Sequence, residues 1–246
     1  MKHSPRSRKP ASLSESLDKQ LNLYTLAAKA NHVVICAAAA SAAGASTLAL
    51  VPVAEAKIIY TPAHVQILQS GSVFFDFDYG PKSADYDFGI RRGRDCKSVT
   101  ACLSGMVAFG YRPVSNAIAA TAHGFAAALP PGKQMGPHRQ VIEQAEMAVV
   151  GYDYKYHTTG WSGAWANGGR GLKNGYLGLK FTLNGKVHYG WARVSLTVKG
   201  NRFDTATLTG YAFETIPNKP IIVGKTHGPD VVVQHGTLGQ LTLGRE

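Results

Sequence analysis

The chain has 246 residues, of which 45% are hydrophobic and 17% are charged, with 27 Gly and 12 Pro. This composition excludes a disordered polymer, a collagen-like repeat and a membrane protein with many spans. The 26 Lys and Arg outnumber the 15 Asp and Glu, which gives a formal net charge of +11, and three Cys are too few for a disulfide-rich miniprotein. One globular domain with an N-terminal extension is therefore expected.

Residues 1–56 have the composition of an export signal. The first 32 residues are basic, Val33–Val53 contains no charged residue, and residues 54–56 form a small-x-small site (AEA). This order predicts a signal peptide with a long basic n-region and a helical apolar part, cleaved after Ala56. The protein is then secreted or held in the cell envelope. Two alternatives stay open: residues 33–53 as an uncleaved membrane anchor, or as a buried core helix.

The cysteines fit export. Cys36 lies in the apolar stretch and leaves with it, whereas Cys96 and Cys102 remain, six positions apart. In an oxidising compartment such a pair is expected to form a structural disulfide around a small loop. A redox or zinc site favours a C-x-x-C spacing or further ligands.

Strand patterns dominate after residue 56. Ser72–Tyr79 (SVFFDFDY) and Asp85–Ile90 are predicted to be two antiparallel strands. The strongest prediction is a hairpin over Gly175–Val198, because Asn184-Gly185 supplies the two positive-φ residues of a type I′ turn.

The remaining segments complete a mostly β pattern. Further strands are expected at Thr205–Glu214 and Pro220–Val223, a weak helical pattern at Arg139–Val150, and a long loop at Ser115–Gly136. Short strands separated by Gly, Pro and Asn turns favour an antiparallel β-sandwich or jelly-roll-like domain over residues 57–228. A short tail, residues 229–246, follows it.

Basic residues are in excess throughout the predicted mature chain, where 20 Lys and Arg face 12 Asp and Glu. They are scattered, apart from a group at Arg91, Arg92, Arg94 and Lys97. One small group is too little for a nucleic-acid interface, so no nucleic-acid partner is expected. A glycan or an anionic envelope polymer is the candidate partner, although the excess charge can also serve solubility alone.

Four acidic residues, Asp76, Asp78, Asp85 and Asp87, lie on the first predicted hairpin. Carboxylates gathered in this way are candidate ligands for calcium, although their spacing does not match an EF-hand loop. The alternative is that they are solvated carboxylates on a strand face. No other cofactor is expected.

The Gly-rich run at residues 161–175 (WSGAWANGGRGLKNG) holds the candidate ligand-binding residues Trp161, Trp165, Asn167 and Arg170. Two exposed Trp rings on such a loop can stack on sugars, while Asn and Arg supply polar contacts. The alternative is that both Trp are core aromatics.

No catalytic motif is recognisable, and the histidines after residue 56 are far apart in sequence. We therefore expect no enzyme, but a binding or structural, adhesive component. The alternatives are a secreted hydrolase using Glu143, Glu146 or an Asp of the first hairpin, and a membrane-anchored periplasmic domain.

Several segments resemble a known group of proteins. AEAKIIYTPAHVQI, WANGGRGLKNGYLGLKF, NGKVHYGWARV and TLTGYAFETIPNKPIIVGKT, within residues 54–226, resemble secreted proteins of unknown function from Acidobacteria. The last two also resemble a module of exported bacterial proteins, many of which end in a PEP-CTERM sorting tail. The resemblance implies export and a β-rich fold, and it assigns no catalytic residues.

Overall fold

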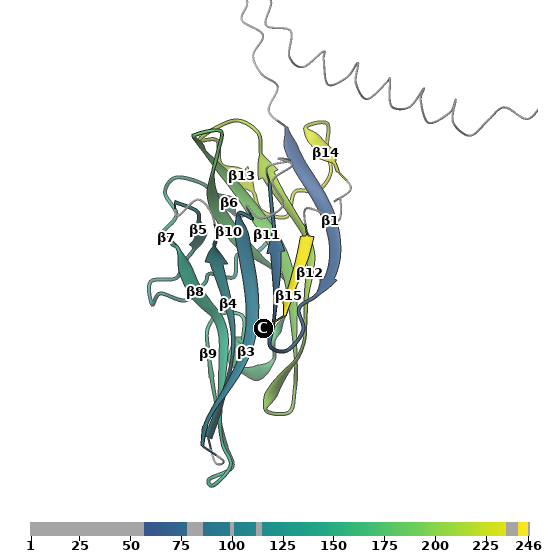
Figure 1. Cartoon of the computed structure of the whole chain (residues 1–246). Helices are drawn as coiled ribbons and strands as arrows, with labels where there is room; N and C mark the ends of the chain where they lie inside the picture. Colours follow the sequence, from purple (N-terminus) through teal and green to yellow (C-terminus); the bar gives the residue numbers. More distant parts are fainter. Residues whose placement is uncertain (1–56, 78–85, 99–100, 112–114, 235–240, 246) are drawn as a thin grey trace, which may run out of the picture. The chain divides into compact units, whose positions relative to one another are not determined.

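The computed structural model describes residues 57–77, 86–98, 101–111, 115–234 and 241–245 (Figure 1). The predicted signal, residues 1–56, lies outside this part of the chain, as do Asp78 and Asp85. Within the described ranges no helix is both long and apolar enough to cross a bilayer.

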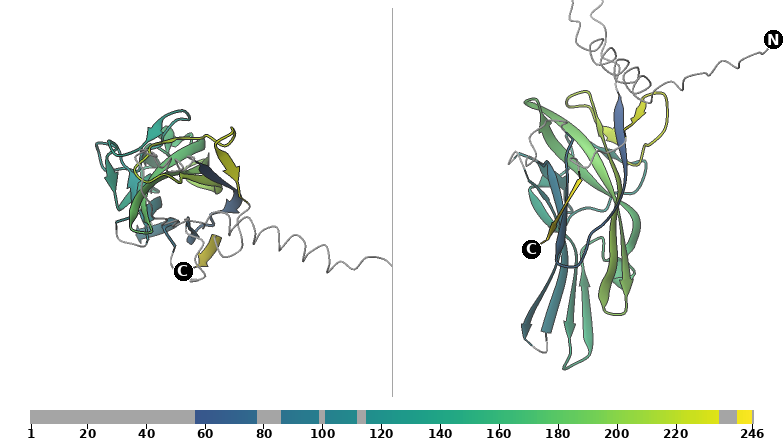
Figure 2. Two further views of the ribbon diagram at one scale, coloured as in Figure 1. Left: turned by 90° about the horizontal axis from the view of Figure 1, so that it is seen from above. Right: turned by 45° about the vertical axis from the view of Figure 1, so that its right-hand side comes forward.

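Two large sheets form a sandwich, which confirms the predicted mostly β, antiparallel fold (Figures 1 and 2). In spatial order, the seven-stranded sheet contains β14 (Val231–Val233), β1 (Ile58–Gln66), β12 (Arg202–Glu214), β11 (Lys186–Lys199), β10 (Leu172–Leu183), β5 (Ala117–Ala119) and β7 (Val141–Ile142). The six-stranded sheet contains β15 (Leu241–Arg245), β2 (Gly71–Phe75), β3 (Phe88–Ser98), β4 (Ala101–Gly110), β8 (Gln144–Asp153) and β9 (Thr158–Ser162). A small sheet pairs β6 (Gln134–Met135) with β13 (Ile221–Ile222).

The hairpin of β10 and β11 forms as the sequence predicts. Leu183 pairs with Lys186 across a two-residue turn, and Asn184 and Gly185 have φ angles of 51° and 73°. Both are positive, as a type I′ turn requires. β12 then continues the sheet beside β11, and it includes the whole of the predicted strand Thr205–Glu214.

Aromatic side chains fill the space between the sheets. Phe77, just after β2, stacks on Phe181 of β10 with 4.5 Å between the ring centroids. Phe75 of β2 meets Tyr211 of β12 at 5.3 Å. Burying rings of this size contributes about 1.5–3 kcal/mol each. These contacts hold one sheet against the other.

The seven-stranded sheet is covered on its other face as well. All residues from His188 to Ala192 are buried. Successive side chains of a strand point to opposite faces, so both faces of β11 are buried here. On the outer face Trp191 packs in a second apolar cluster with Leu129, Met135 and Ile221. Leu129 and Met135 belong to the chain between β5 and β10, so part of that segment covers the outer face of the seven-stranded sheet.

That cover partly corrects the expectation of a long loop at Ser115–Gly136, because the segment is irregular over most of its length but includes two short strands. The segment contains β5 and β6, and Leu129 forms a β-bridge with Tyr176. Gly178 of β10 allows this segment to lie close to the sheet, because a side chain there would come within 2.7 Å of the Met135 sulfur. Three alanines of the segment, Ala117, Ala119 and Ala126, are buried, which reflects packing against a sheet.

The helical pattern at Arg139–Val150 is also wrong, because this segment forms β7 and most of β8. Both Met147 and Ala148 are buried, where a regular strand would alternate. A register shift between Met106 and Val107 of the partner strand β4 accompanies this break in alternation. An irregular strand thus imitates the spacing of a helix.

The sheets continue beyond residue 228, the predicted end of the domain. β14 pairs in parallel with β1, and β15 pairs with β2 from Leu241↔Phe75 to Arg245↔Gly71. Val231–Val233 and Leu241–Arg245, both within the predicted tail, therefore add a strand to each large sheet.

A disulfide joins Cys96 of β3 to Cys102 of β4, which confirms the predicted pair. The two residues face each other directly across the strands, with 4.0 Å between their Cα atoms. The bond lies near the end of the hairpin, and it is compatible with an extracellular location.

We expect the double variant Cys96→Ser, Cys102→Ser to lose about 2 kcal/mol of unfolding free energy, since the closed loop is short. Urea denaturation of the full chain measures this loss. The variant is compared with the oxidised parent and with the parent after reduction of its disulfide. Equal stability of all forms would contradict the prediction, and would mean that the hairpin end opens independently of the core.

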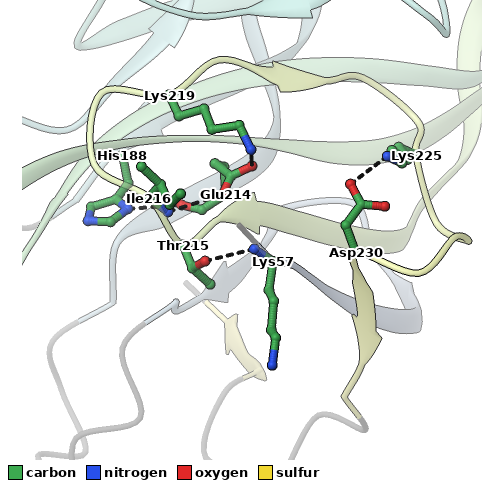
Figure 3. Close-up of polar contacts among 8 residues, drawn as sticks. All are labelled: Lys57, His188, Glu214, Thr215, Ile216, Lys219, Lys225 and Asp230. Carbon is green, nitrogen blue, oxygen red and sulfur yellow. Dashed lines mark hydrogen bonds and ion pairs between the residues drawn. The ribbon is translucent and has the colours of Figure 1, made fainter. Parts of the chain in front are cut away.

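Polar contacts tie the start of β1 to the end of β12 (Figure 3). The backbone N–H of Lys57 donates to Thr215 Oγ1 at 3.1 Å, and the Thr215 N–H donates to the Lys57 carbonyl at 2.9 Å. His188 Nδ1 lies 2.9 Å from the carbonyl oxygen of Glu214, which fixes this buried ring within β11. The first residue after the predicted cleavage site is thus already held by the sheet.

Two carboxylates at the same end are paired (Figure 3). Glu214, with 3% of its side chain exposed, accepts from Lys219 Nζ at 3.1 Å and from the Ile216 N–H at 3.1 Å. Asp230 pairs with Lys225 at 2.6 Å, and this hydrogen bond lowers the pKa of Asp230. Both carboxylates therefore serve the loops after β12.

Candidate functional site: a basic cleft between the sheets

A cleft of about 100 Å³ opens where the inner face of β3, β4 and β8 meets the start of β12. The β3–β4 and β8–β9 hairpins and the turn between β11 and β12 all reach this end of the sandwich (Figures 1 and 2). Three arginines line the cleft, namely Arg92, Arg94 and Arg202. Within the described part of the chain, none of them forms an ion pair with a carboxylate.

Arg92 forms the floor of the cleft and is only 6% exposed. Its Nη1 donates to the carbonyl of Ile67 at 3.1 Å and its Nη2 to that of Phe203 at 3.0 Å, with longer contacts of 3.4 Å to the Asp204 carbonyl. Burial lowers the pKa of Arg92, and the charge of Asp204 partly offsets this. One buried guanidinium thus joins the two sheets and places positive charge beneath the cleft.

Arg94 and Arg202 stand at the rim and are exposed. Arg94 lies two residues after Arg92, so both side chains project from the same face of β3. Its Nη2 donates to the Tyr154 hydroxyl at 3.0 Å, which links β3 to the end of β8. Arg202 approaches from the opposite sheet. Together the two rim arginines present guanidinium donors to anything entering the cleft.

Uncharged polar side chains complete the lining. They are Gln69 from the β1–β2 connection, Ser104 from β4 and Asn201 from the β11–β12 turn. None of the three makes a side-chain hydrogen bond to another described residue. Elsewhere in the fold comparable side chains are paired, for example Asn116 with Asp87 and Asn174 with Ser195. The cleft therefore gathers donors and acceptors that are open to a ligand.

Tyrosines continue from the cleft to the end of the β8–β9 hairpin. Tyr152 and Tyr154 both line the cleft, and their rings contact each other edge to face at 4.4 Å. The Tyr152 hydroxyl lies 3.2 Å from His157 Nδ1. Beyond them Tyr156 is 65% exposed, with Lys155 Nζ 5.1 Å from its ring centre. The surface beside the cleft is thus aromatic as well as basic.

The Gly-rich run does not present two exposed Trp faces. Trp165 is 0% exposed and belongs to the core between the sheets, so the core interpretation holds for this residue. Gly175 makes room for it, since a side chain there would come within 2.7 Å of the Trp165 ring. Trp161 is half-buried and packs edge to face on Phe203 at 5.6 Å. It therefore lies behind a wall of the cleft.

Asn167 and Arg170 are exposed but engage their own loop. Asn167 Nδ2 donates to the Gly171 carbonyl at 3.1 Å, and Arg170 Nε lies 3.5 Å from the Asn167 carbonyl oxygen. Gly169, with φ of 89°, lies against Trp161, where any side chain would collide with the indole. The glycines thus allow the loop to close over the two Trp.

The acidic group is partly accounted for by packing. Asp87 is buried and accepts from the Phe77 N–H and from Asn116 Nδ2, both at 2.9 Å. Asp76 is also buried. This corrects the expectation of solvated carboxylates for these two residues. Among the described side chains no group of three or more His, Cys, Asp or Glu converges for a metal ion. Since Asp78 and Asp85 lie outside that part of the chain, calcium binding stays a prediction.

The alternative catalytic residues are separate from the cleft. Glu143 and Glu146 are both exposed, on or beside β8, and neither lines the cleft. His188 is buried against Phe181 and Phe213.

Sequence reasoning identifies Arg92 and Arg94 only as members of a small basic group. Their spacing of two residues is that of one strand face, but the predicted strand ends at Ile90, whereas β3 continues to Ser98. Gln69, Asn201 and Arg202 carry no local signal, because the fold alone brings them to β3.

Comparison with known proteins adds no relative: no family model, curated protein or solved structure matches the chain.

Proposed function

We propose that this protein is a secreted or envelope-associated binding protein whose basic cleft holds an acidic group of an extracellular or envelope polymer. The observation that carries the proposal is the meeting of Arg92, Arg94 and Arg202 at one cleft without a paired carboxylate among the described residues. Arg residues suit this task because their planar donors match carboxylate and phosphate oxygens.

Burial strengthens the electrostatic argument. Arg92 is held below the cleft by backbone carbonyls, without an ion pair to a described carboxylate, and the charge of Asp204 offsets only part of the effect of burial. Charges that are partly shielded from water interact over longer distances than exposed ones. An anion in the cleft would compensate this charge while the two rim arginines bind it directly.

Export belongs to the same proposal. It rests on the predicted signal at residues 1–56 and on the Cys96–Cys102 disulfide, which is compatible with an oxidising compartment. A chain that starts at Lys57 would retain the hydrogen bonds between Lys57 and Thr215. The intact mass of protein recovered from its own host tests this part: a mass that still includes residues 1–56 would contradict it.

For the cleft, we expect the full-length double variant Arg94→Gln, Arg202→Gln to bind anionic polymers about tenfold more weakly, because two charge-assisted contacts are lost. Binding of polygalacturonate, dextran sulfate and polyphosphate is measured by titration calorimetry, with uncharged dextran as the reference. Raising the salt concentration should weaken binding by the parent.

The matched control is Arg139→Gln with Lys186→Gln, which removes the same charge from two exposed basic residues outside the cleft. We expect this control to bind as the parent does. Equal weakening of both double variants would mean that net charge, rather than the cleft, attracts the polymer. Binding to none of the polymers would overturn the proposed function.

A further inference from the structure

We infer that the ligand of the basic cleft is a hydroxyl-rich carboxylate, an acidic sugar of the uronic acid type. This rests on the proposed function, since it names the chemical class of the acidic polymer. The inference comes from the uncharged polar side chains of the lining, which would have no hydrogen-bond partner on a ligand that carried only an anionic group.

The volume of the cleft sets the size of what enters. At about 100 Å³ the cleft has room for a small group only. This space admits a carboxyl group and the adjoining part of one sugar ring, whereas ligand pockets for whole small molecules usually start at about 300 Å³. The rest of the polymer must therefore lie outside, on the surface beside the cleft.

The neutral polar side chains match hydroxyl groups. Gln69 and Asn201 each offer amide donors and a carbonyl acceptor, and Ser104 offers a hydroxyl. A sugar hydroxyl both donates and accepts, so it can use either half of an amide. All three side chains lack an intramolecular partner among the described residues. A sulfate ester or a phosphodiester, which only accepts, would not use their acceptor atoms.

The tyrosines match the other surface of a sugar. Tyr154, which lines the cleft, is 42% exposed, and Tyr156, two residues further along the same turn, is 65% exposed. An aromatic face packs against apolar C–H groups, and a tyrosine keeps its hydroxyl for polar contacts. The Arg94–Tyr154 hydrogen bond joins the acid-binding and ring-binding parts. A carboxylate and a sugar ring can thus be held at the same time.

The test compares anionic polymers that differ from an acidic sugar either in lacking sugar hydroxyls or in the kind of acidic group. Full-length protein is titrated with polygalacturonate, with poly-glutamate, which carries carboxylates without sugar hydroxyls, and with dextran sulfate. We expect polygalacturonate to bind at least tenfold more tightly than either of the others. In the triple variant Gln69→Ala, Ser104→Ala, Asn201→Ala this preference should disappear while poly-glutamate binding stays unchanged.

The outcomes separate the inference from the proposed function. Equal binding of all three anionic polymers by the parent, unaffected by the triple variant, would overturn the acidic-sugar inference and leave an anion-binding cleft. A second result would also overturn the acidic-sugar inference and leave an anion-binding cleft. In that result the double variant Arg94→Gln, Arg202→Gln loses all binding while the parent shows no preference for polygalacturonate. If no anionic polymer binds, both proposals fail. Circular dichroism of the triple variant confirms that it is folded, and Asn174→Ala, in a polar residue outside the cleft, is the control substitution.

Discussion

Trp165→Ala is expected to lower the free energy of unfolding by about 3–5 kcal/mol, the usual cost of removing a fully buried Trp. Trp165 is 0% exposed and packs in the core between the sheets, and the room that Gly175 leaves for its ring would become a cavity. Equilibrium denaturation in guanidinium chloride measures the loss.

Two further variants make this prediction specific. Trp165→Phe should retain most of the stability, partly because the buried indole Nε1 has no acceptor among the described residues, so its loss removes no hydrogen bond. Trp161→Ala, in a half-buried ring, should cost less than Trp165→Ala. A Trp165→Ala protein of parental stability that no longer binds a sugar would restore the exposed-platform interpretation.

Arg92→Met is expected to cost about 3 kcal/mol or more in unfolding free energy and to abolish binding of anionic polymers in the cleft. The side chain is buried and donates to the carbonyls of Ile67, Phe203 and Asp204, which would all lose this donor. A buried acceptor left without a donor costs about 1–3 kcal/mol. Stability and binding are measured on the same preparation.

A matched arginine separates structure from binding in this experiment. Arg193 of β11 is half-buried and donates to Thr209 and to the Tyr60 hydroxyl, outside the cleft. Arg193→Met should therefore destabilise the protein without changing its affinity for polygalacturonate. Arg92→Lys should keep part of the binding, because it retains the positive charge. The loss of the rest is expected because an ammonium group cannot reach the carbonyls of Ile67, Phe203 and Asp204 together. Full binding by Arg92→Met would contradict a role for this charge.

Local patterns predict the strands whose signals lie within a few neighbouring residues. The Asn184-Gly185 turn is one example, because two positive φ angles at adjacent positions are a property of those residues themselves. The segment Arg139–Val150 is the opposite case. Its buried positions are set by an irregular pairing with β4, which no spacing within the segment records.

The candidate site is less accessible to sequence reasoning. Trp161 and Trp165 share a Gly-rich run, yet Trp165 lies in the core and Trp161 behind the cleft. Whether a Trp faces water or a neighbouring sheet depends on which strands cover it. Likewise Gln69 and Asn201 lie more than a hundred residues apart and meet only because β12 crosses beside β1.

The pairing of β1 with β12 also constrains the order in which the chain can fold. Ile58 lies opposite Glu214, and β2 finds its outer partner only at Leu241–Arg245, so contacts of very long sequence separation define both sheets. High contact order of this kind slows folding, because large loops must close before such contacts form. The larger sheet cannot be completed until nearly the whole chain has been synthesised. A nascent chain shorter than that lacks the native partner of β1, its first strand.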